Sequence, residues 1–248
     1  MTDALIIGAG PAGLMAADVL SQAGLAVTVA DAMPSVGRKF LMAGKSGLNL
    51  TKDEDPTAFL AAFGDVPPVM RAAVSAFDPV EVMAWAEDLG QPLFTGSTGR
   101  VFPKAMKASP LLRAWLTRLG DAGVTLRTRW RWCGWDGAET MFNTPEGRVA
   151  LTPKVTVLAL GGASWARLGS DGQWAQYLPD AVAPFAPANM GFVVEWSHHM
   201  DKFLGQPVKS VALHAGDVTT RGEFVISARG IEVAGLTRCR APCAKVRR

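Results

Sequence analysis

The sequence predicts an α/β protein with a first domain built on a parallel sheet and a second, mostly β domain. Two observations predict the first domain. An apolar run at residues 4–7 leads into a glycine-rich segment at residues 8–13, and a second apolar run at residues 26–30 ends at Asp31. The third observation predicts the second domain. After about Pro184 the sequence pattern changes, and prolines separate short segments of alternating polar and apolar residues.

A strand–helix–strand unit opens the chain. The first apolar run predicts a buried strand, and Pro11 stands at a first helical position, where its missing N–H costs nothing. Residues 14–23 predict the helix, and Gly24 is a typical C-terminal stop. The second apolar run predicts another buried strand, which carries Asp31 at its end.

Each glycine of Gly8-Ala9-Gly10-Pro11-Ala12-Gly13 has a physical role. Gly8 permits a tight strand-to-helix turn, Gly10 lets the backbone approach a pyrophosphate, and Gly13 lets the helix pack close to the sheet. The helix N-terminus offers free N–H groups to the phosphates. Asp31, eighteen residues after Gly13, can accept both hydroxyls of an adenosine ribose. The unit predicts a Rossmann-like dinucleotide-binding site, and an Asp without an adjacent Arg argues against NADP.

The rest of the first domain divides into elements with recognisable boundaries. Asp55-Pro56 predicts a helix start, and Asp78-Pro79-Val80-Glu81 is a capping box in front of another helix. The other predicted elements are a hairpin at residues 91–103, a helix from residue 109, strands at 124–129 and 149–151, and a strand at 155–160 that is apolar enough for the centre of the sheet.

A basic, glycine-rich segment with little periodicity occupies residues 37–51, where a dehydrogenase of this fold would continue into its next helix. Its backbone amides, together with Arg38 and Lys39, could wrap a long anionic cofactor. A flexible surface loop is the alternative for any glycine-rich segment of this kind.

Residues 37–51 resemble the G-R-K-x-L-x-x-G-x-G-x-x-N-x-T signature of a bacterial flavoprotein family. Its members are described as NAD(P)/FAD-dependent oxidoreductases or aminoacetone-oxidase-family FAD-binding enzymes, and one relative reduces ring double bonds of bile-acid intermediates. The resemblance spans about residues 4–232 and continues through residues 99–103, 111–116, 158–165 and 222–232. Leu48 stands where many relatives carry Cys, so no thiol chemistry is carried over.

The resemblance implies FAD as the cofactor and adds two glycines that follow the predicted strand at 155–160. An ordinary strand-ending turn is the alternative for this glycine pair. The candidate cofactor-binding residues are Gly8, Gly10, Ala12, Gly13, Asp31, Ala32, Arg38, Lys39, Asn49, Thr51, Gly161 and Gly162.

Catalytic residues cannot be assigned from the sequence. Flavins carry hydride and electron chemistry themselves. No Ser/His/Asp or Cys/His arrangement is tied together by the sequence, and no Cys and His set has the spacing of a metal site, so we expect no metal. A small organic molecule is the expected substrate. No second G-x-G-x-x-G segment is present, so no dedicated NAD(P)H site is visible, but NAD(P)H could still dock transiently as the reductant.

The resemblance also predicts the domain organisation. It implies a FAD-binding Rossmann-like domain at residues 1–185 and the start of an inserted, β-rich domain at 186–232 that is incomplete. Residues 233–248, with five basic residues and no acid, do not match the family. This end predicts a truncated or frame-shifted product; the alternative is a short variant with a basic tail.

Composition limits the class of protein. With 248 residues and 49% hydrophobic content, the chain can build one large or two modest cores. It has no run of the ~18–20 apolar residues that a membrane span needs. Met1-Thr2-Asp3 lacks the positive segment of a signal peptide. We therefore expect a cytoplasmic protein with no membrane partner.

A nucleic-acid partner is a further hypothesis to weigh. Eight basic residues and one acid lie between Ser97 and Trp132. A nucleic-acid surface needs the basic groups on one face. Because the apolar residues at 111–116 fit a protein core better, we expect no nucleic-acid partner. The leading function is an FAD-dependent oxidoreductase; a catalytically silent remnant and an NAD-dependent dehydrogenase remain alternatives.

Overall fold

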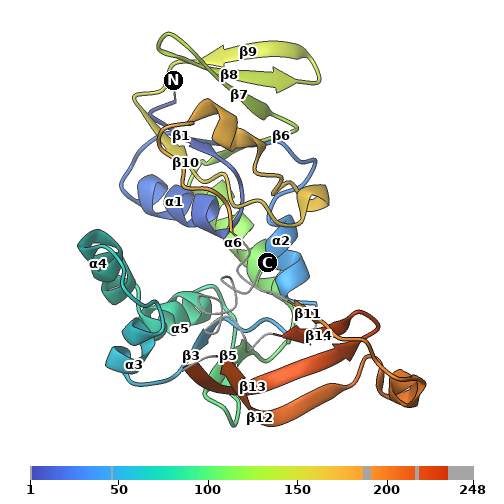
Figure 1. Cartoon of the computed structure of the whole chain (residues 1–248). Helices are drawn as coiled ribbons and strands as arrows, with labels where there is room; N and C mark the ends of the chain where they lie inside the picture. Colours follow the sequence, from blue (N-terminus) through green and yellow to red (C-terminus); the bar gives the residue numbers. More distant parts are fainter. Residues whose placement is uncertain (1, 46, 187–190, 216–217, 234–248) are drawn as a thin grey trace. The chain divides into compact units, whose positions relative to one another are not determined.

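The computed structural model describes residues 2–45, 47–186, 191–215 and 218–233 (Figure 1). The chain divides into two compact units, with the boundary between Val182 and Ala183. Apart from Val233, the unmatched C-terminal segment at 233–248 lies outside the described residues.

A four-stranded parallel sheet is the centre of the first unit. Its order is β10-β1-β2-β6, built from β1 (Ala4–Ile7), β2 (Val27–Asp31), β6 (Thr125–Thr128) and β10 (Val155–Leu158). Ile7 at the end of β1 pairs with Ala30 and with Leu158, so three of the strands end together. The predicted strand–helix–strand unit is confirmed, with α1 (Pro11–Gln22) joining β1 to β2.

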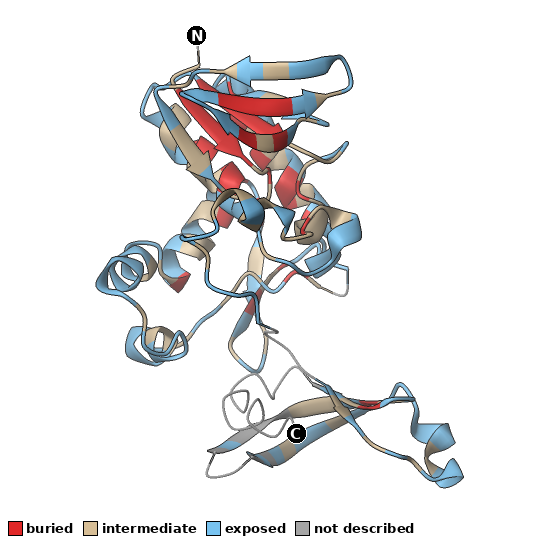
Figure 2. Ribbon diagram, turned by 45° about the horizontal axis from the view of Figure 1, so that its top comes forward, coloured by how far each residue is buried: buried red, intermediate tan, exposed pale blue. Residues whose placement is uncertain are grey.

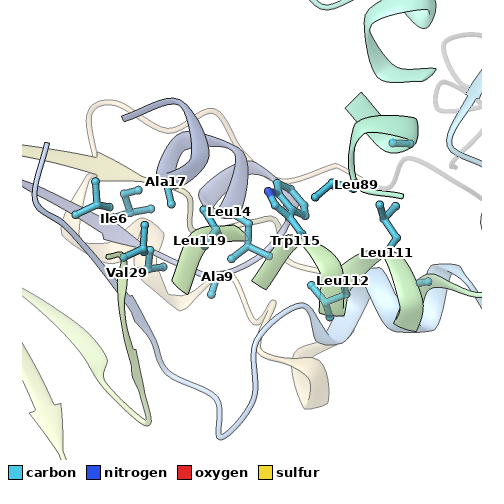
Figure 3. Packing of buried hydrophobic residues seen from close by; sticks show 14 of the residues in the cluster. Ile6, Ala9, Leu14, Ala17, Val29, Leu89, Leu111, Leu112, Trp115 and Leu119 are labelled. Carbon is cyan, nitrogen blue, oxygen red and sulfur yellow. The ribbon is translucent and has the colours of Figure 1, made fainter. Parts of the chain in front are cut away.

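One face of this sheet carries the larger core (Figures 2 and 3). Ile6 and Val29 pack there against Leu14 of α1 and against Leu111 and Trp115 of α6 (Ala108–Asp121). Full burial of each such side chain stabilises the fold by about 1.5–3 kcal/mol. The predicted apolar face of the helix after residue 109 is therefore confirmed.

A buried carboxylate joins α1 to α6 inside this core. Asp18 is 3% exposed and its Oδ2 accepts a hydrogen bond from Trp115 Nε1 at 2.9 Å. Its Oδ1 accepts from Gln22 Nε2 at 2.8 Å, and Arg118 lies 3.8 Å away. Buried charges need such partners, so this cluster fixes how α6 lies against α1, the helix that follows the glycine-rich turn.

The opposite face of the sheet is covered by an antiparallel meander. Its strands are β7 (Arg131–Asp136), β8 (Glu139–Thr144) and β9 (Gly147–Leu151), in the order β7-β8-β9. Leu5 and Ile7 form a second core there with Trp132 and Phe142. Two short 3-10 helices, η1 (Ala166–Leu168) and η2 (Gln173–Tyr177), follow β10 in the chain.

The segment between β2 and α6 forms short helices and a small antiparallel sheet. Asp55 caps α3 and Asp78 caps α5, each accepting two backbone N–H bonds at 2.8–3.1 Å, as the sequence predicts. The predicted hairpin is also present as β4 and β5. The elements are α2 (Arg38–Ala43), β3 (Thr51–Lys52), α3 (Pro56–Ala61), α4 (Pro68–Ala76), α5 (Pro79–Asp88), β4 (Leu93–Thr95) and β5 (Arg100–Pro103), with the sheet order β3-β5-β4.

The second unit is mostly β, which agrees with the predicted fold class. Its described residues form an antiparallel sheet in the order β11-β14-β13-β12 and a 3-10 helix. Trp196 Nε1 donates to the Ser227 carbonyl at 2.8 Å. Its elements are β11 (Gly191–Val193), η3 (His198–Phe203), β12 (Pro207–Ala215), β13 (Val218–Ser227) and β14 (Gly230–Val233).

The position predicted for the strand at 155–160 is wrong. Among the described residues β10 pairs only with β1, so it stands at an end of the sheet, while β1 and β2 occupy the middle. Val155 is 50% exposed. The β-branched composition of this strand reports its fit to a pleated surface rather than its place in the sheet.

No helix within the described parts of the chain is long and apolar enough to cross a bilayer.

Candidate functional site

A cavity of about 420 Å³ opens where β1, β2 and β10 end. Ile7, Asp31 and Ala159 line it at the three strand ends, and all of its lining residues belong to the first unit. In open α/β sheets, ligands bind at the carboxyl ends of the strands. This volume falls within the range of about 300–1,000 Å³ that is typical of small-molecule sites.

The glycine-rich turn between β1 and α1 forms one wall of the cavity. Gly8 has a φ of +106°, and a Cβ there would lie 2.2 Å from the Ala159 carbonyl oxygen. A Cβ at Gly13 would lie 1.8 Å from the Gly8 carbonyl oxygen. Both positions therefore need glycine for the fold itself, because the turn, β10 and α1 approach each other too closely for a side chain.

Gly10 differs from these two glycines. It lines the cavity as the N-cap of α1, and a Cβ there would meet no described atom within 4 Å. Its φ of −81° is open to any residue. Packing within the described chain does not require glycine at this position, so its missing side chain leaves the space beside a helix N-terminus to a ligand. This observation fits a bound diphosphate.

Asp31 connects the glycine turn to the segment that follows β2. Its Oδ2 accepts from the Ala9 backbone N–H at 2.7 Å, and its Oδ1 accepts from the Met33 N–H at 2.8 Å. Each carboxylate oxygen can accept a second bond, and the side chain lines the cavity with Ala32 beside it. The carboxylate is thus held by two backbone N–H groups and keeps acceptor capacity at the cavity.

Arg38 and Lys39 reach the same cavity through a backbone contact. Gly37 N–H donates to the Ala9 carbonyl at 2.9 Å, which places the first turn of α2 against the glycine turn. Arg38 Nε is buried and has no hydrogen-bond partner among the described residues. A buried cationic donor of this kind needs an acceptor, and a ligand anion in the cavity would provide one.

Lys39 has protein partners instead. Its Nζ lies 3.1 Å from Ser164 Oγ and 3.3 Å from Ser170 Oγ, and Ser170 Oγ donates to the Gly162 carbonyl at 2.8 Å. Gly161 lines the cavity beside them. Lys39 therefore ties the segment after β10, more than 120 residues later in the chain, to the start of α2.

The structure does not bring every predicted residue to the cavity. Gly13 and Ala12 lie behind the turn in α1, and Gly162 contributes the carbonyl that Ser170 uses. Asn49 and Thr51 are absent from the cavity lining, and Thr51 pairs with Val101 in the small sheet. Their contact with a cofactor remains a prediction.

An aromatic wall of the cavity was missed by the sequence analysis. Trp130, Trp132 and Tyr177 line the cavity, and the rings of Trp132 and Tyr177 meet edge to face at 5.1 Å. Trp132 is 6% exposed, and its Nε1 has no hydrogen-bond partner among the described residues. The alternation of Trp and Arg at residues 127–132 was the available signal, although it also suggested a core strand or a charged surface.

Two arginines that are far from Asp31 in the sequence, Arg129 and Arg131, lie near the end of β2 in the fold. Arg129 N–H donates to the Met33 carbonyl at 3.1 Å, and Arg131 lines the cavity while its guanidinium pairs with Asp171 at 3.4 Å. Arg131 is therefore at the cavity although it follows Asp31 by one hundred residues, and the exclusion of NADP stays a prediction. No group of three or more His, Cys, Asp or Glu side chains that could hold a metal is found in the described part of the chain.

The fold and the cavity define a Rossmann-type dinucleotide-binding protein. The family described as HI0933-like protein Rossmann domain matches residues 2–221, and the chain belongs to this family. The match confirms the predicted resemblance to FAD-binding oxidoreductases and supports FAD as the dinucleotide.

Known proteins resemble the chain over part of their length. A ribosomal RNA dihydrouridine synthase of Haemophilus influenzae is 27% identical over 210 residues, which cover 81% of this chain and 50% of the relative. The 3-ketosteroid-Δ4-(5α)-dehydrogenase of Rhodococcus jostii RHA1 superimposes with a TM-score of 0.51 at 16% identity, covering 65% of this chain and 46% of the other. THI4 of Thermovibrio ammonificans gives a TM-score of 0.43 at 18% identity over 64% and 57% of the two chains.

The likeness to the steroid dehydrogenase shows the fold alone. The chain spans about half the length of the Haemophilus influenzae relative, and less than half of the steroid dehydrogenase.

Proposed function

We propose that this chain binds FAD in the cavity at the ends of β1, β2 and β10, and that it acts as an oxidoreductase on a small organic substrate. The observation that carries the proposal is Gly10 at the N-terminus of α1. Packing among the described residues does not require glycine there, and the missing side chain leaves space in the cavity. Bound FAD would supply the hydride or electron chemistry.

Different residues of the cavity would bind different groups of the cofactor. Gly10 lines the cavity as the N-cap of α1, and the positive end of the helix favours a diphosphate at this position. Asp31, held by two backbone N–H groups, can accept ribose hydroxyls. Arg38 can pair its unpartnered Nε with a further acceptor of the cofactor.

The segment from Gly161 to Ser170 limits the cavity on the side of β10. Gly161, Leu168 and Ser170 line it there, and Lys39 holds the segment in place through the two serine hydroxyls. Water exclusion and cofactor orientation at this side therefore depend on a contact between distant parts of the chain.

The test measures the nucleotide that the purified chain binds. Protein prepared without added cofactor is denatured, and the released nucleotide is identified by chromatography and absorbance. Calorimetric titrations with ADP, FAD and NAD then compare affinities. We expect FAD in the extract and FAD binding tighter than NAD. Retention of NAD with no affinity for FAD would support the dehydrogenase alternative, and no nucleotide binding would support the silent remnant.

A second candidate function is the reduction of a uracil ring in RNA. The Haemophilus influenzae relative, named a ribosomal RNA dihydrouridine synthase, aligns with 81% of this chain. Dihydrouridine arises when a hydride and a proton are added across the C5=C6 bond of uracil, which is chemistry that a reduced flavin can supply. Exposed arginines at positions 127, 129 and 131 stand beside the cavity end that Asp31 marks.

The RNA candidate opposes the expectation that the protein has no nucleic-acid partner, and one assay decides between them. Reduced, FAD-loaded protein is incubated with ribosomal RNA that lacks the modification, and dihydrouridine is measured by mass spectrometry after nuclease digestion. Formation of dihydrouridine above a no-enzyme control would establish RNA as the substrate. Its absence, with turnover of a small ring compound, would favour the first candidate.

A further inference from the structure

The segment between Gly161 and Ser170 carries an exposed tryptophan in an unfavourable backbone conformation. Trp165 has φ 65° and ψ 54°, in the left-handed region that large side chains rarely adopt. Its side chain is 52% exposed, so burial does not compensate for this conformation. Backbone strain of this kind persists where surrounding contacts impose it, and it concentrates at functional sites.

The contacts that impose the conformation come from both sides of Trp165. Ser164, immediately before it, is hydrogen-bonded to Lys39, and the Trp165 carbonyl accepts from Leu168 N–H at 2.8 Å. Leu168 and Lys39 line the cavity. Trp165 does not itself line the cavity, but it lies in the chain between the lining residues Gly161 and Leu168, and this stretch is the rim of the proposed cofactor site. Its backbone is held through contacts of Leu168 and of Ser164, which is bonded to Lys39.

A cation accompanies the exposed ring. The Arg167 guanidinium carbon lies 5.4 Å from the centre of the Trp165 ring, within the usual range of a cation–π contact. Arg167 is exposed and forms no ion pair with any residue that the structure describes. Its charge is consequently available to an anion that approaches the ring.

We propose that Trp165 and Arg167 form a recognition site for the substrate at the rim of the cavity: the indole stacks on a planar, conjugated ring, and the guanidinium pairs with an acidic group attached to that ring. This inference rests on the proposed function, because it places the substrate beside the cofactor cavity. It specifies a planar ring acid as the substrate class. Aromatic stacking with a nearby cation selects planar anions over saturated ones.

The test measures binding of three small probes to the full chain by ligand-observed saturation-transfer NMR. Orotate is a planar ring with a carboxylate, uracil is the planar ring without it, and cyclohexanecarboxylate is an acid without a planar ring. We expect orotate to bind at least about tenfold more tightly than either of the others, since it alone uses both side chains.

Four variants separate the roles of the two residues. Trp165→Gly removes the ring and suits the left-handed backbone, so it should fold as well as the parent and weaken orotate binding about tenfold. Trp165→Phe keeps a ring and should retain most of the affinity. Arg167→Ala should reduce orotate binding to the level of uracil, and Arg167→Lys should restore part of it.

A matched control lies in the second unit, where Lys202 Nζ stands 5.0 Å from the centre of the exposed Phe203 ring. Phe203→Ala removes a similar exposed aromatic–cation pair and should leave orotate binding unchanged. Equal binding of orotate by the parent and Trp165→Gly would overturn the inference, and so would loss of folding in every Trp165 variant, which would assign the residue a structural role.

ADP titrations of the same variants distinguish failure of this inference from failure of the proposed function. Trp165→Gly should bind ADP as the parent does, because the glycine turn and Asp31 are unchanged. Normal ADP binding without any preference for orotate would refute only the rim site. Absence of ADP binding in the parent chain would refute the proposed function itself.

Discussion

Replacing Gly10 by valine should abolish nucleotide binding while leaving the fold intact. A Cβ at position 10 meets no described atom within 4 Å, and the φ of −81° suits valine. Loss of a glycine cap costs at most about 1 kcal/mol, and the lower entropy of the unfolded valine chain offsets part of it. For a chain of this size, the melting temperature should therefore change by no more than about 2–4 °C.

The effect on binding should be much larger. The valine side chain would fill the space beside the first turn of α1 and would keep a diphosphate away from its N–H groups. Hydrogen bonds to a charged group contribute about 1.5–3 kcal/mol each, so losing two of them costs about 3–6 kcal/mol. This corresponds to a loss of about 10²- to 10⁴-fold in affinity, and calorimetric titration with ADP measures it directly.

Two other glycines provide the controls for this experiment. Gly120 is exposed in α6, also meets nothing within 4 Å, and is absent from the cavity lining, so Gly120→Val should bind ADP normally. Gly13→Val would place a Cβ 1.8 Å from the Gly8 carbonyl oxygen and should prevent correct folding. Normal ADP affinity in a folded Gly10→Val protein would refute the assignment of the phosphate site.

The remaining predictions concern three other contacts. Asp31→Asn keeps the shape of the side chain but loses its charge, so ADP affinity should fall about 10- to 100-fold; an unchanged dissociation constant would show that Asp31 does not bind the ribose. Lys39→Met removes the bonds to the two serine hydroxyls, so amide hydrogen exchange at residues 161–170 should accelerate, and unchanged protection would mean that Lys39 does not hold this segment. Asp18→Ala leaves the buried Trp115 N–H without its acceptor, so urea denaturation should show a loss of about 2–4 kcal/mol in unfolding free energy; a loss below about 0.5 kcal/mol would show that the buried cluster adds little to stability.

The glycine turn and Asp31 at the cavity were predictable because they belong to one local unit of the chain. The turn at Gly8 to Gly13 follows directly from a strand and opens a helix, and Asp31 ends the next strand of the same unit. Asp55 and Asp78 cap helices through bonds to residues only two or three positions ahead. Interactions within so few residues depend on side-chain chemistry and backbone geometry that the sequence displays.

The limits of the sequence appear where contacts are distant. Arg38 and Lys39 are adjacent and both basic, yet Arg38 Nε lacks a partner among the described residues while Lys39 bonds to Ser164 and Ser170. Nothing local distinguishes these two side chains. Trp132 likewise looks like an ordinary core residue of a strand until the fold places it in the wall of the cavity.

The sequence by itself determined the α/β class, the strand–helix–strand unit and the glycine turn and Asp31 that line the cavity. Tertiary structure alone decided that β10 stands at an end of the described sheet, that Asn49 and Thr51 lie away from the cavity lining, and that a strained tryptophan stands at its rim. The physical reason is the range of the interactions. Backbone turns and caps are completed within one element, whereas the cavity exists only after strands separated by more than one hundred residues pair side by side.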